Sequence, residues 1–236
     1  MALSLRGSAE NSAISGTDVT VTHPVGTAEN DVIYLAYAVG AATNINMSVS
    51  TAGWTELADL YSNATTDANL GVYRKIMGAT PDSTVTVVGT ADTADGTAAV
   101  EHVWTGADTT TPEDATRTTD TGSGDPDSPA ITTATDNAII LTLACNGDSD
   151  TAVTAPTGYS NKIDINAFDT RKATVAIASK SVGAAPVTEN PDPWGGWGGI
   201  NTGWCAATVA IRPATAATAF FPPWPQRIYQ PTQLAA

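Results

Sequence analysis

The sequence predicts an all-β protein, an antiparallel β-sandwich of jelly-roll type with an internal duplication, followed by an extended C-terminal arm. Three observations favour this class. Thr, Gly, Ala and Val are abundant whereas Leu and Met are few, short apolar or alternating runs are separated by turn residues, and the same order of runs occurs twice. With 236 residues and 42% hydrophobic content, the chain is long enough to bury one large core.

The duplication is visible as four pairs of segments that keep the same order and nearly the same spacing. Its clearest pair is Lys-Ile-Met-Gly-Ala-Thr-Pro at 75–81 against Lys-Ser-Val-Gly-Ala-Ala-Pro at 180–186. The other pairs are 30–38 with 136–144, 53–54 with 158–159, and 96–104 with 203–211. Such a repeat predicts a single domain, residues 1–213, built from two related halves at about 14–106 and 128–213.

In the first half, residues 18–22 and 84–87 alternate polar and apolar side chains, as half-buried strands do. Residues 32–39 are apolar on both faces, which is typical of a central strand that is covered on each side. The half is completed by an aromatic strand around Trp54, a strand at 70–77 that ends in a Gly-Ala-x-Pro turn, and a closing strand at 98–104.

The second half repeats the pattern, with strands at 138–145, around Tyr159, at 174–182 and at 205–211. This arrangement favours either two related sheets or the interleaved halves of one jelly roll. The joining stretch 107–129 is rich in Thr, Asp, Gly and Pro. We therefore expect it to be an elaborated surface connection and the most mobile loop.

Composition limits the partners. Ten Lys and Arg stand against 24 Asp and Glu, for a net charge of −14, so binding to a phosphate backbone would act against the field of the molecule and nucleic acid is not expected. No run is apolar enough for a signal peptide or a membrane span, which predicts synthesis in a bacterial cytoplasm and no membrane partner. Cys145 and Cys205 lie in apolar strand-like runs, which favours buried free thiols over a disulfide.

Segments 32–37, 53–57, 71–75 and 205–213, together with Pro81, occur in an order that resembles duplicated β-sandwich domains of bacteriophage virion proteins and some secreted bacterial proteins. The resemblance covers about residues 14–213. It implies a structural or adhesive role without shared catalytic residues. The Trp-rich insert at 193–199 and everything after Pro213 depart from the pattern, so specific function is expected there.

The arm, residues 214–236, combines prolines with aromatic side chains, which predicts an extended segment near polyproline II. We expect it to anchor the protein on a neighbouring subunit or another virion protein, because aromatic side chains dominate interface energies and a proline-stiffened arm loses little entropy on docking. Folding back over its own sandwich is the alternative. The expected partner-binding residues are Phe220, Phe221, Trp224, Arg227 and Tyr229.

The insert offers a second candidate. Trp194 and Trp197 on a glycine-rich loop have rings that could stack on the sugars of a host-surface glycan. The alternative is that these rings cap the sandwich or bury against a neighbouring subunit.

Signals for catalysis or metal binding are weak. His23 precedes Pro24 and is interpreted as a surface turn, whereas His102 alternates with Val100 and is interpreted as a partly buried strand residue. The residue spacing predicts no metal site and no cofactor; acidic pairs at 148 and 150 or at 125 and 127 are the weak candidates for calcium. Glu101 and Asp59 would be the first carboxylates to test for a glycosidase.

These observations predict a non-enzymatic bacteriophage virion structural protein, either a capsid decoration protein or head fibre, or a tail component. It would act in the virion by protein-protein association, with other capsid or tail proteins and as a homo-oligomer. The alternative is a carbohydrate-binding module for host glycans, using Trp194, Trp197 or Trp204. A polysaccharide-degrading enzyme is the third hypothesis.

Overall fold

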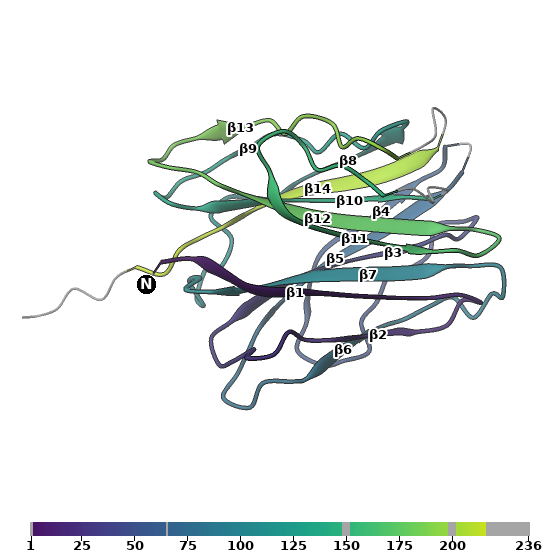
Figure 1. The fold of residues 1–236 in the computed structure, drawn as a ribbon, viewed down its shortest axis with the longest axis horizontal. Coiled ribbons are helices and arrows are strands. Elements are labelled where there is room, and N and C mark those ends of the chain that lie inside the picture. The colour runs from purple at the N-terminus through teal and green to yellow at the C-terminus, as the bar shows by residue number, and fades with distance from the viewer. Residues whose placement is uncertain (1, 65, 148–151, 198–201, 216–236) are drawn as a thin grey trace, which may run out of the picture.

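The protein is an all-β antiparallel sandwich, which confirms the predicted fold class. The structure is a computed structural model that describes residues 2–64, 66–147, 152–197 and 202–215. Two five-stranded sheets pack face to face, and two short ribbons lie outside them (Figure 1). None of the described segments forms a helix of the length and apolarity needed to cross a membrane.

Each half of the sequence forms one of the large sheets, and the two sheets have the same strand order. The first sheet has the order β1 (Ser4–Ala13), β7 (Thr97–Thr105), β3 (Val32–Val39), β5 (Ala68–Ile76) and β4 (Thr55–Ser62). The second has the order β8 (Thr118–Ser123), β14 (Gly203–Ile211), β10 (Ile139–Asn146), β12 (Ala173–Ser181) and β11 (Ser160–Ala167). The ribbons pair β2 (Val19–Thr22) with β6 (Thr84–Val87), and β9 (Ile131–Thr132) with β13 (Thr188–Glu189).

Reciprocal hydrogen bonds join the halves at both ends of the sandwich. At one end, Gly96 N donates to Arg171 O and Gly203 N donates to Thr66 O, each over 2.8 Å. In the duplication Gly96 is equivalent to Gly203, and Thr66 is equivalent to Arg171. The two bonds are therefore related by a pseudo-twofold axis between the halves. The first and last described residues lie at the other end, where Asp108 N donates to Arg212 O over 2.9 Å and Ala214 N donates to Gly106 O over 2.8 Å. Ala107 and Pro213 form a bridge between these two bonds.

The core lies between the sheets and continues on their outer faces. Alternate residues of β3 and β10 face the inter-sheet core, and the residues between them are buried under the ribbons and loops outside. Every residue of β3, β10 and β14 is buried, which explains why these strands are apolar on both faces.

The edge strands β1 and β8 lie outside the ranges predicted for the two halves of the domain. Both precede the expected starts of the halves at 14 and 128, and β8 lies inside the stretch predicted to be a surface connection. Both strands are polar and partly exposed, so they lack the apolar alternation from which strands are predicted. Arg6 on β1 forms an ion pair with the buried carboxylate of Asp31 over 2.5 Å, which fixes this edge to the turn before β3.

Candidate functional site

The end of the sandwich that carries the N-terminus and the last described residues contains a groove of about 570 Å³, which we call the terminal groove. In Figure 1 the chain that follows β14 runs to the N-terminal residues at this end. Residues from four separate segments line the groove, namely 2–3, 135–137 with 139, 181–182 and 212–215. Asp108 completes the lining.

The walls of the terminal groove combine apolar and charged groups. Leu3, Ile139 and Val182 supply apolar surface. On the rim, the amides of Thr111 and Thr110 donate to the carboxylate of Asp108 over 3.0 and 2.8 Å, and these bonds lower its pKa below the ordinary value. Asp108 is therefore ionised at neutral pH.

Two further charged residues line this groove. Asp136 is exposed and accepts a hydrogen bond from the amide of Ala185 over 2.8 Å. Arg212 lies 3.4 Å from the buried carboxylate of Asp114. The guanidinium therefore already has an acidic partner, and its charge also helps to lower the pKa of Asp108. Neither rim aspartate forms an ion pair among those found in the described residues.

The predicted partner-binding residues of the arm, Phe220, Phe221, Trp224, Arg227 and Tyr229, lie outside the described residues. The described chain ends at Thr215, which itself lines the terminal groove. The structure thus fixes where the arm begins.

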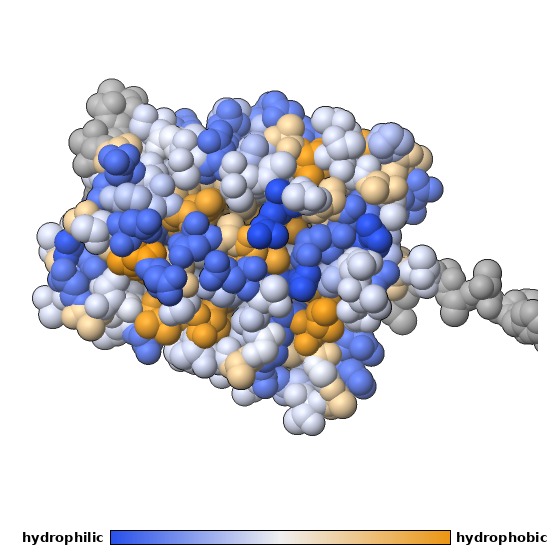
Figure 2. Space-filling model, turned by 180° about the vertical axis from the view of Figure 1, so that it is seen from behind, coloured by the Kyte–Doolittle hydropathy of each residue, from blue (hydrophilic) through white to orange (hydrophobic). Residues whose placement is uncertain are grey.

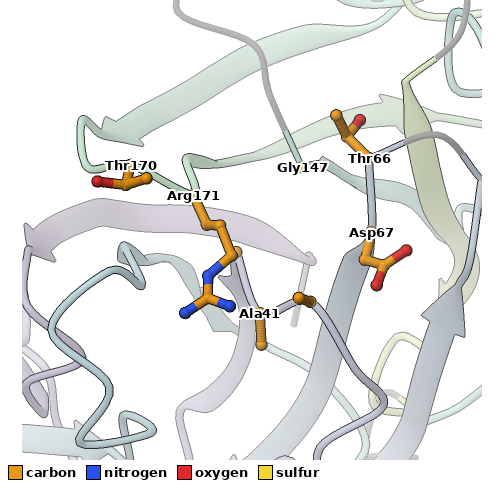
Figure 3. Close-up of a pocket in the computed structure, with 8 residues that line it drawn as sticks. Ala41, Thr66, Asp67, Gly147, Thr170 and Arg171 are labelled. Atoms are coloured by element: carbon orange, nitrogen blue, oxygen red, sulfur yellow. The ribbon is translucent and has the colours of Figure 1, made fainter.

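At the opposite end, a smaller pocket of about 300 Å³ lies where the two halves meet. Figure 3 shows Asp67 from the first half and Arg171 from the second half on its two sides. Arg171 pairs with Asp95 and Asp92, each over 2.5 Å, and Asp67 accepts a hydrogen bond from the hydroxyl of Tyr61 over 3.0 Å. Because both charged side chains are engaged within the protein, this pocket is best explained as a junction between the halves.

The hypothesis that Trp194 and Trp197 stack on sugars does not fit the structure. Both side chains are 0% exposed and pack edge to face, with 6.1 Å between the ring centroids. The Trp194 indole N–H donates to Thr142 Oγ1 over 3.0 Å. The rings pack on the part of the outer face of the second sheet that the short β9–β13 ribbon does not cover. Their role is therefore structural. Trp204 belongs to the same cluster and is 6% exposed.

His23 is also not the surface residue that the sequence predicted. Its Nδ1 lies 2.8 Å from Glu101 Oε1, and the two side chains are 1% and 0% exposed. Burial raises the pKa of Glu101 above the ordinary value, and the bond from His23 opposes part of that rise. Both side chains of the pair are thus shielded from solvent, so the pair is best explained as part of the core.

His102 is a buried strand residue, and it is more completely buried than predicted. Its Nε2 donates to Asn161 O over 2.9 Å, and burial lowers its pKa to about 4. The ring is therefore neutral at neutral pH.

The carboxylates considered for a glycosidase are not a pair. Glu101 lies on β7 and Asp59 on β4, with β3 and β5 between them, so three inter-strand steps separate their strands by about 14 Å. Glycosidases need their two carboxyl groups about 5–9.5 Å apart, and Glu101 is fully buried.

Of the calcium candidates, 148 and 150 lie outside the described residues, and 125 and 127 are exposed. The described part of the chain contains no group of three or more side chains that could hold a metal.

Cys145 and Cys205 are buried free thiols that lie directly opposite each other on β10 and β14. Their Sγ atoms donate to Asn69 O over 3.6 Å and to Ala68 O over 3.4 Å, across the inter-sheet core.

Sequence reasoning did not find the terminal groove, because its lining comes from four distant segments that have no shared motif. The Trp layer did have a signal. The outer-face residues beneath it are small, namely Ala144, Ala176, Ala178 and Ala206, and such a face leaves room for two indole rings.

Comparison with known proteins found no matching family model and no significant match among curated proteins or solved structures.

Proposed function

We propose that this protein is a structural component of a bacteriophage particle, held by the end of the sandwich that carries residues 2–3 and 212–215. The observation that carries the proposal is the position of Thr215. The aromatic and proline-rich segment 216–236 starts at this end, beside residues 2–3 and the terminal groove.

The body of the sandwich suits a rigid, projecting unit. Its halves are joined at both ends by reciprocal backbone hydrogen bonds, and the core strands are covered on both sides. On the face seen in Figure 2, apolar patches are separated by polar side chains, so this face resembles an ordinary solvated surface. The resemblance of the repeated segments to virion sandwich domains points to the same role.

The test is incorporation into particles. A chain that lacks 216–236 is expected to fold as the wild type does, with the same β-sheet circular dichroism, and to be absent from purified particles. Replacement of the exposed Phe168 by Ala changes an aromatic residue at the opposite end of the sandwich and should leave incorporation intact. Normal incorporation of the shortened chain would remove the proposal that this segment anchors the protein.

A further inference from the structure

The terminal groove is a suitable receptor for an apolar chain segment that carries one positive charge. Its apolar wall is formed by Leu3, Ile139 and Val182, and its rim carries Asp108 and Asp136. A volume of about 570 Å³ falls in the range in which proteins bind ligands with buried side chains.

The chain itself provides such a segment. Residues 216–236 contain two Phe, one Trp and one Tyr, and their one charged side chain is Arg227. This basic residue is unusual in a protein of net charge −14, and it complements the acidic rim of the terminal groove.

The pseudo-twofold relation between the halves shows which edge of its own sandwich is closed to the segment. In the second half, the chain that follows the Ala107 crossing pairs with the edge of β14, first at Glu113 opposite Ile211 and then through β8. The equivalent edge of the first half belongs to β7, and it is already paired with β1 over Ser4 to Ala13. The chain after Pro213, which is equivalent to the chain after Ala107, therefore cannot pair with β7 in the same way, because β1 already does.

We propose that the terminal groove of one copy receives the C-terminal segment of a second copy. An extended segment advances about 3.1 Å per residue, so Phe220 can lie about 16 Å and Trp224 about 28 Å from Thr215. Those distances are enough to cross to an adjacent molecule. The prolines at 222, 223 and 225 keep the aromatic part of the segment extended, which favours a reach to a second molecule over a compact fold at the groove where the segment starts. This proposal rests on the proposed function, because it names one partner of the anchoring segment.

The experiment measures molar mass by light scattering during size-exclusion chromatography. We expect the full chain to have the mass of at least two chains, and the chain without 216–236 to have the mass of one. Ser181→Trp places a large ring in the groove from an exposed position at the end of β12, and should also give single chains. Thr119→Trp is the matched control, an exposed strand position on β8 outside the groove, and should leave the mass unchanged.

Mixing then separates exchange between copies from other modes of association. The chain without 216–236 keeps the groove, and the Ser181→Trp chain keeps the segment, so only together should these two variants form a complex. Asp136→Lys, which reverses one rim charge, should weaken the association of the full chain. This variant provides the test even if Ser181→Trp impairs folding.

A full chain with the mass of one chain would overturn the proposal. So would a Ser181→Trp chain that associates as strongly as the Thr119→Trp chain, or a mixture without a complex. Particle incorporation is assayed separately. A full chain that remains single in solution but enters particles would remove this proposal and leave the structural role. A full chain that associates through the groove but never enters particles would remove the structural role and leave this proposal.

Discussion

Replacement of Trp194 by Ala should greatly reduce the stability of the sandwich. The indole is 0% exposed, donates a hydrogen bond to Thr142 and packs against Trp197. Replacement of a fully buried Trp by Ala lowers the free energy of unfolding by about 3–5 kcal/mol. The lost edge-to-face contact with Trp197, worth about 0.5–1.5 kcal/mol, places the expected loss in the upper part of that range. We therefore expect a loss of about 4–5 kcal/mol, which is a large part of the 5–15 kcal/mol typical of a folded domain.

Urea unfolding, followed by circular dichroism, measures this loss. Phe168→Ala is the matched control, because it also removes an aromatic ring from the second half but at a side chain that is 60% exposed. Its effect should stay within about 0.5 kcal/mol. If Trp194→Ala cost less than about 1 kcal/mol, the claim that this residue forms a structural layer on the second sheet would be refuted.

Two further predictions concern the core and the junction between the halves. The pKa of His102 is about 4 in the folded state and near 6.5 in the unfolded chain, so only the unfolded state gains this proton as pH falls from about 6.5 to 4. Between pH 7 and pH 4 the free energy of unfolding of the wild type should fall by about 3 kcal/mol more than that of His102→Gln, as measured by urea unfolding at the two pH values. Equal decreases in the two proteins would contradict the burial of a neutral ring. Gly147→Ala should cost about 1–3 kcal/mol, because its Cβ would overlap the carbonyl oxygen of Asp67 in the other half, whereas Gly183→Ala meets open space and should be nearly neutral. Equal thermal stability of these two variants would show that the halves do not approach as closely as described.

The sequence predicted the central strands because their pattern is local. Residues 32–39 and 138–145 are continuous apolar runs, and β3 and β10 lie there within one residue. The edge strands β1 and β8 were not predicted, because partly exposed edges tolerate Arg6, Glu10 and a run of Thr without an apolar face. β1 is held in place by hydrogen bonds to β7, and β8 by hydrogen bonds to β14. The local sequence of an edge strand does not reveal which strand it pairs with.

The surroundings of the candidate site residues were harder to predict for the same reason. His23 resembles a turn residue beside Pro24, and its burial depends on Glu101, which follows 78 positions later. The Trp insert looked accessible because its glycines suggested a loop, but the small side chains of the second sheet provide a place for both rings. The terminal groove exists only because the pseudo-twofold arrangement brings the N-terminal residues next to the end of β14.

The most direct test of the account is the position of the chain in purified particles, determined by electron cryomicroscopy. We expect the sandwich to project from the particle and to contact it through the end that carries residues 2–3 and 212–215. Particles in which the sandwich is held by the opposite end, at 40–42 and 170–171, or which do not contain the chain, would contradict it.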